Sequence, residues 1–154
     1  MMNLCCDVIR RLQGKTLVTA ESLTGGGIGA ALTSVSGSCS VYKGGVISYT
    51  NAVKNQILGV SAEVLDQYGA VSEPVAKAMA QGVRKLLEAD VAVSVTGLAG
   101  PGGDEYGNPV GTVFIGYSDA DITEVKHFLF AGDRESIRKQ TAEKALKLVL
   151  KNVK

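Results

Sequence analysis

The sequence is short of histidine, cysteine and net charge, and each shortage excludes a class of protein. His127 is the only histidine, so most histidine-based metal sites are ruled out and a Ser-His-Asp triad would have a single candidate base. The three cysteines are an odd number, and Cys5 and Cys6 are neighbours, which does not suit a disulfide framework. The 16 basic and 15 acidic residues leave a net charge of +1, whereas a basic nucleic-acid face needs clustered Lys and Arg. We therefore expect no metal, no cofactor and no nucleic-acid partner.

Long apolar runs are also missing. No run reaches the ~18 residues that a membrane span requires, and the first residues lack a basic segment followed by an apolar one. These absences predict a protein of the reducing cytoplasm with no membrane partner. The 154 residues are enough for one domain, 1–154, whose core needs no metal or disulfide for stability.

The hydrophobic pattern alternates between strand and helix periods. Strands are expected over residues 16–20, 46–50, 91–96, 112–118 and 124–130. Helices are expected over 3–13, 24–36, 51–59, 61–68, 73–88 and from 133 onward. The last two strands are joined by a short polar turn, as in an antiparallel hairpin. The pattern predicts the α/β class, with one mixed sheet of about five strands covered by helices on both faces.

Glycine is abundant and unevenly placed. Of the 19 glycines, 13 fall in two windows, 25–45 and 97–111. Glycine allows a backbone to come close to a ligand, so the windows are interpreted as two loops that meet around a ligand, with plain surface turns as the alternative. If strands 16–20 and 91–96 are parallel, both loops leave the same edge of the sheet, where ligands of open α/β sheets collect.

The first glycine loop, residues 21–27, lies between a strand and a helix. Free amides at a helix N-terminus favour an anion such as phosphate, and the hydroxyls of Ser22 and Thr24 could add hydrogen bonds. The pattern matches neither of the standard nucleotide fingerprints, and plain helix capping is the alternative. The second loop, residues 96–103, follows the most apolar strand.

Three further features could carry chemistry. Ser38, Cys39 and Ser40 are adjacent nucleophile candidates beside Gly37. Lys54 falls in the first turn of an expected helix capped by Asn51, where the helix dipole opposes a cation, lowers its pKa and favours a general base. An exposed surface lysine is the alternative.

Arg134 opens the last helix, and Arg138 follows one turn later. The planar guanidinium of Arg134 fits phosphate, with a surface pair to Asp133 as the alternative.

Eight segments together resemble the CinA C-terminal domain family in order and spacing. They are Thr19–Gly26, Gly37–Cys39, Gly45–Asn51, Lys54, Gly69–Pro74, Thr96–Pro101, Pro109–Val113 and Gly132–Arg134. The resemblance implies a three-layer α/β/α sandwich with a mixed, mostly parallel sheet. It also implies a nicotinamide-nucleotide amidase, which converts nicotinamide mononucleotide and water to nicotinate mononucleotide and ammonia without a metal.

The resemblance also implies a nucleophile–lysine dyad. Lys54 matches the family lysine and Tyr49 the tyrosine beside it, while Ser22, Thr96 and Arg134 match positions that line the nucleotide site. The usual Gly-Ser-Ser is Gly-Ser-Cys here, so Cys39 occupies the expected nucleophile position. Leu23 stands where the family usually has cysteine. The chain has no room for the extra N-terminal domain of longer members and looks like the stand-alone form.

The resulting hypothesis is an amidase in which Cys39 attacks the carboxamide, Lys54 takes and returns the proton, and Tyr49 supports the relay. The expected substrate-binding residues are Ser22, Thr24, Gly25, Gly26, Ser38, Thr96, Gly97, Gly100 and Arg134. Because Cys39 replaces serine, a nucleotide-binding or partner-binding domain without turnover is an alternative; an amidase for another amide is a third. Family members tend to self-associate, so a dimer or larger homo-oligomer is expected.

Overall fold

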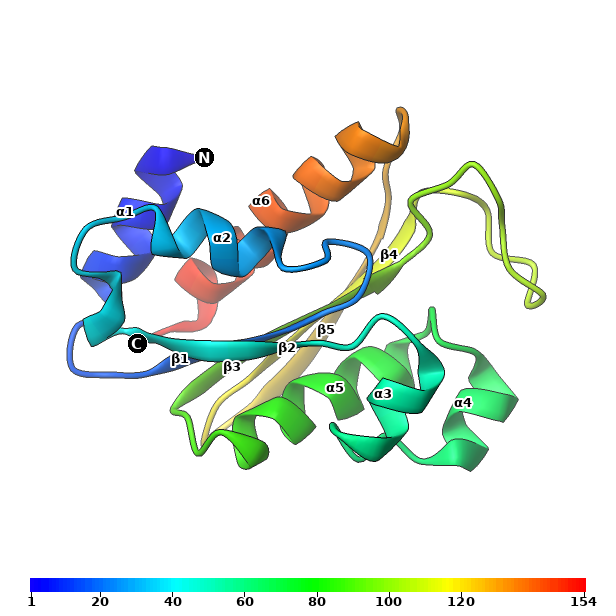
Figure 1. The fold of residues 1–154 in the computed structure, drawn as a ribbon, viewed down its shortest axis with the longest axis horizontal. Coiled ribbons are helices and arrows are strands. Elements are labelled where there is room, and N and C mark those ends of the chain that lie inside the picture. The colour runs from blue at the N-terminus through cyan, green and yellow to red at the C-terminus, as the bar shows by residue number, and fades with distance from the viewer.

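The computed structural model describes residues 1–154 and contains six α-helices, five strands and one short 3₁₀ helix (Figure 1). In chain order the elements are α1 (Met2–Arg11), β1 (Leu17–Glu21), α2 (Gly27–Thr33), η1 (Ser38–Ser40), β2 (Tyr42–Ile47), α3 (Asn51–Gln56), α4 (Ala62–Tyr68), α5 (Glu73–Leu86), β3 (Val91–Gly97), β4 (Thr112–Ser118), β5 (Thr123–Leu129) and α6 (Arg134–Asn152). None of the helices is both long and apolar enough to cross a membrane.

The five strands form one sheet in the order β2-β1-β3-β4-β5. β1 pairs in parallel with both β2 and β3, and β4 is antiparallel to β3 and to β5, so only β4 runs against the other four. Helices α1, α2 and α6 cover one face, and α3, α4 and α5 lie on the other (Figure 1). The predicted α/β class, three layers and mostly parallel sheet are therefore confirmed.

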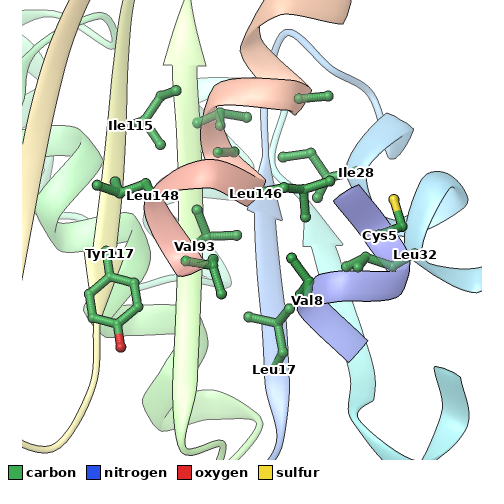
Figure 2. Packing of buried hydrophobic residues seen from close by; sticks show 14 of the residues in the cluster. Cys5, Val8, Leu17, Ile28, Leu32, Val93, Ile115, Tyr117, Leu146 and Leu148 are labelled. Carbon is green, nitrogen blue, oxygen red and sulfur yellow. The ribbon is translucent and has the colours of Figure 1, made fainter. Parts of the chain in front are cut away.

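The central strands β1 and β3 are buried on both faces, which fixes the loops that follow them. On one face, side chains of α1, α2 and α6, such as Val8, Leu32 and Leu146, pack against Leu17 and Val93 of these strands (Figure 2). On the other face, one stripe of α5 packs against alternate residues of the same strands: Val75, Met79 and Val83 against Val18, Ala20 and Ala92. Two-sided burial explains the continuous apolar runs of these two strands.

The strand expected at 46–50 is Tyr42–Ile47 in the structure. The expectation was wrong because Gly44 and Gly45, which suggest a loop, lie inside the strand. A side chain at Gly45 would overlap Thr19 and the Tyr42 hydroxyl, and one at Gly29 of α2 would meet the same hydroxyl. The hydroxyls of Thr19 and Tyr42 are hydrogen-bonded at 2.7 Å. Gly29 and Gly45 of the first glycine window therefore make room for Tyr42 between α2 and β2.

Candidate active site

A pocket of about 380 Å³ opens at the carboxyl ends of β1 and β3, within the size range of small-molecule sites. It is lined by Ser22, Leu23, Tyr49, Lys54, Ala70, Val71, Thr96, Gly97, Leu98, Ala99, Gly100, Gly102 and Arg134. The loops after β1 and β3 both contribute, as expected from parallel neighbouring strands. The convergence of the two loops is therefore observed. Seven of the predicted site residues line the pocket: Ser22, Tyr49, Lys54, Thr96, Gly97, Gly100 and Arg134.

At the floor of the pocket, a serine contacts a buried lysine. Lys54 is only 1% exposed, and its Nζ lies 3.1 Å from the Oγ of Ser22. The same nitrogen donates to the main-chain oxygen of Ser48 at 2.8 Å and to that of Tyr49 at 3.4 Å. Ser22 directly follows β1, and Lys54 belongs to α3, which begins after β2. Because β1 and β2 are adjacent and parallel, the residues after their carboxyl ends lie close together. Thr50 caps α3 by accepting from the amide of Val53, in place of the expected Asn51.

Burial lowers the pKa of Lys54 from 10.5 to about 8. The cause is removal of the ammonium from water, and not the helix dipole that the sequence pattern suggested. A neutral amine has two N–H groups and one lone pair. The two carbonyl oxygens of Ser48 and Tyr49 can take both N–H groups, which leaves the lone pair to accept the proton of the Ser22 hydroxyl. The geometry and the lowered pKa together suit a serine nucleophile and a lysine base.

Thr24, Gly25 and Gly26 do not line the pocket, because a carboxylate occupies the amides that were expected to hold phosphate. The side chain of Glu21, 1% exposed, accepts hydrogen bonds from the amides of Gly26, Ile28 and Gly29 at 2.9–3.1 Å and from the hydroxyl of Thr24. The carboxylate of Glu21 therefore balances the positive end of the α2 dipole without a ligand. A side chain therefore takes these amides, as in the capping alternative, but it is that of Glu21 and not of Ser22 or Thr24.

Cys39 and Ser38 lie at the other end of the molecule from Lys54. Both belong to η1, which precedes β2, whereas Lys54 belongs to α3, which follows it (Figure 1). A six-residue strand is about 20 Å long, so the sulfur atom is far outside the reach of the amine. Cys39 is exposed, Ser38 is buried, and neither lines the pocket. The expected pairing of Cys39 with Lys54 is thus not made, and Ser22 occupies the place next to the lysine.

Arg134 and Tyr49 meet at the mouth of the pocket. The guanidinium of Arg134 donates to the main-chain oxygen of Gly100 at 2.7 Å and to the hydroxyl of Tyr49 at 3.2 Å. Tyr49 is 58% exposed, and only its carbonyl oxygen contacts Lys54, so the structure shows no phenol in a proton relay. Thr96 is almost fully buried, and its hydroxyl donates to the carbonyl of Ala70, which fastens a second wall of the pocket.

Two supporting residues have no assigned role in the sequence pattern. Glu21 ends a buried strand just before a glycine-rich turn, a position that hints at an internal cap. Arg138 donates from α6 to the carbonyls of Leu23 and Thr24 at 2.9 and 3.2 Å, which ties the turn after β1 to a helix more than a hundred residues later. The single histidine, His127, stacks on Phe114 across β4 and β5 and does not line the pocket.

Comparison with known proteins places the chain among its relatives by sequence. Residues 3–153 match the model of the CinA C-terminal domain. A CinA-like protein of Parasynechococcus marenigrum is 54% identical over 121 residues, 79% of this chain and 29% of that protein. A putative competence-damage inducible protein of Bacillus pumilus is 46% identical over 144 residues, 94% of this chain and 34% of that protein. The chain thus spans about a third of the length of these curated relatives.

Solved structures agree closely with the fold. The competence damage-inducible protein A of Klebsiella pneumoniae superimposes with a TM-score of 0.95 at 37% identity, covering 98% of this chain and 95% of that one. A competence/damage inducible protein of Agrobacterium tumefaciens gives a TM-score of 0.94 at 36% identity, covering 97% and 93%. The family model, the identities and these superpositions together show that the chain belongs to the CinA C-terminal domain family.

Proposed function

We propose that the protein hydrolyses the carboxamide of nicotinamide mononucleotide, with Ser22 as nucleophile and Lys54 as general base and acid. The contact of 3.1 Å between Ser22 Oγ and a lysine Nζ that is buried at the floor of a pocket carries the proposal. A serine hydroxyl is a weak nucleophile unless a base removes its proton, and a desolvated amine is a suitable base near neutral pH. The amide substrate and the nucleotide are taken from the family resemblance.

The reaction divides into two proton-balanced halves. The oxygen of Ser22 attacks the carboxamide carbon while its proton moves to the amine of Lys54. The ammonium returns this proton to the leaving nitrogen as the C–N bond breaks, which releases ammonia and leaves an ester on Ser22. Water then attacks the ester, and one of its protons passes through Lys54 to Ser22 as the ester bond breaks. The second proton stays on the carboxylic acid, which gives it to the released ammonia, so that the final products are a carboxylate and ammonium.

Ammonia release from nicotinamide mononucleotide by the purified protein tests this proposal. We expect turnover that needs no added metal, and a much poorer reaction with nicotinamide riboside, which carries the same amide but no phosphate. Absence of ammonia from the nucleotide at enzyme concentrations that give a clear signal with an authentic amidase would reject the proposed activity.

Arg134 is the cation at the mouth of the pocket and is proposed to bind the phosphate. Arg134→Ala should raise the KM for nicotinamide mononucleotide by about 10- to 100-fold, because a charge-assisted hydrogen bond contributes about 1.5–3 kcal/mol. The kcat should change little, since the guanidinium is at the rim and the reacting groups are at the floor. Lys139→Ala in the same helix is the matched control, because Lys139 pairs with Glu135 in solvent. An unchanged KM in Arg134→Ala would remove phosphate recognition from this residue.

The alternative of a binding domain without turnover depended on cysteine in the nucleophile position. Cys39 lies outside the pocket, and the residue beside Lys54 is a serine. The observation that favoured an inactive domain therefore no longer bears on the site, and hydrolysis is the function that the geometry supports best.

A further inference from the structure

The turn that carries Ser22 contains a main-chain donor without a partner. The amide of Ser22 itself donates to the carbonyl of Val95 at 3.1 Å and is not available to a ligand. The amide of Leu23 donates to no acceptor in the protein, although Leu23 is only 4% exposed and lines the pocket. Its side chain belongs to the hydrophobic core, so what it offers to the pocket is its main chain. Unpaired buried N–H groups are rare in folded proteins, and this one is next to the proposed nucleophile.

The direction of this N–H group is fixed by the turn. Gly25 donates its amide to the carbonyl of Ser22 at 3.1 Å. In a planar trans peptide the C=O and the next N–H point in opposite directions, so the Leu23 N–H points out of the turn. Gly25 has a φ of 58°, in the left-handed region that favours glycine and allows the turn to close. Arg138 holds the following peptide groups from α6 through the carbonyls of Leu23 and Thr24.

We infer that the main-chain N–H of Leu23 stabilises the oxyanion that forms on the substrate, and that Arg138 is the positioning residue that holds it there. The inference rests on the proposed hydrolysis by Ser22. When Ser22 Oγ bonds to the carboxamide carbon, the carbonyl π electrons move to oxygen, and the charge is lost again when the C–N bond breaks. The amide of the residue after the nucleophile is well placed to donate to that oxygen. The amides of Ala99 and Gly100, which also line the pocket, donate to no protein acceptor and can supply a second donor.

Replacing the Leu23 amide by an ester tests the inference directly. The α-hydroxy acid analogue of leucine at position 23 keeps the side chain and removes only the N–H. We expect the kcat for nicotinamide mononucleotide to fall about 100-fold or more, with KM within about twofold, as for other lost oxyanion donors. The control is the same exchange at Ala120, in the turn between β4 and β5, whose amide also has no protein acceptor. Equal kcat values in the Leu23 ester and the wild type would overturn the inference.

Arg138 gives a second readout by ordinary mutagenesis. Arg138→Met should lower kcat about 10-fold or more while KM stays within about twofold, because the turn loses its tie to α6; Lys139→Met, one residue along, should change neither. A fall in thermal stability with unchanged kcat would show a purely structural role and would overturn the assignment of Arg138. If the wild type releases no ammonia, the proposed function fails and takes the inference with it. If the wild type is active, Ser22→Ala is inactive and the Leu23 ester is fully active, the inference alone fails.

Discussion

Ser22→Ala is expected to lower ammonia release from nicotinamide mononucleotide by a factor of about 10³ or more. The variant removes the only hydroxyl that contacts the Lys54 amine, and loss of an activated serine in other hydrolases has effects of at least this size. The fold should persist, because the main-chain hydrogen bond from Ser22 to Val95 and the Glu21 cap do not involve the Ser22 side chain. The measurement is kcat by ammonia detection, with the unfolding midpoint as a check on structure.

The matched control for this experiment is Cys39→Ala. Cys39 is exposed in η1, a strand length away from Lys54, so its loss should leave kcat and KM unchanged. The two variants separate the two candidate nucleophiles. Activity retained in Ser22→Ala and lost in Cys39→Ala would contradict the site as the structure arranges it.

The sheet and its edge could be predicted because they follow from short-range patterns. The strand at 91–96 shows two-sided burial as a continuous apolar run, and the helix at 73–88 shows its stripe and its proline in the first turn. Given two parallel strands, the meeting of the loops after them is a matter of topology. Ser22, Lys54 and Arg134 follow β1, β2 and β5, which all run in the same direction, so they meet at one edge of the sheet although 112 positions separate the first from the last.

The pairing of the reacting groups could not be predicted, because it depends on where a strand begins. An expected strand at 46–50 leaves residues 37–40 in a long loop that is free to reach Lys54. The real strand starts at Tyr42 and fixes Cys39 at the opposite end. The glycines at 44 and 45 suggest a loop in the sequence. At Gly45 the reason for glycine is instead the space taken by Thr19 and the Tyr42 hydroxyl, and the contact with Thr19 joins residues far apart in the sequence.

The amides at the N-terminus of α2, which were expected to bind phosphate, are taken by a side chain of the protein, and this too could not be predicted. A helix start with free amides looks the same in sequence whether its partner is a ligand or a side chain of the protein. Here the preceding strand ends in Glu21, whose carboxylate turns back onto the amides of Gly26, Ile28 and Gly29. These amides are therefore not free for a phosphate, and the proposed phosphate-binding residue is Arg134 at the mouth of the pocket.

Lys54→Met is expected to abolish turnover to the same extent as the serine variant and to remove a pH dependence that the wild type shows. With a pKa of about 8, about a tenth of the Lys54 amines are neutral at pH 7, against about one in 3,000 at the ordinary value of 10.5. Because the neutral amine is the base, kcat/KM of the wild type should rise with pH and level off above about pH 8 to 9. A profile that is flat from pH 6 to 9 would contradict a base with this pKa.

The same pKa predicts a change in stability that needs no substrate. The folded pKa of Lys54 lies below the unfolded value, so the unfolded chain binds more protons between pH 8 and 10.5, and the free energy of unfolding must rise with pH across this window. Relative to Lys54→Met, the wild type should gain about 2 kcal/mol between pH 7 and pH 9.5, measured by urea unfolding at each pH. Other titrating groups are common to both proteins and cancel in the difference. A constant difference across this range would show that the amine keeps its ordinary pKa in the folded protein, and Lys54 could not then serve as the base near neutral pH.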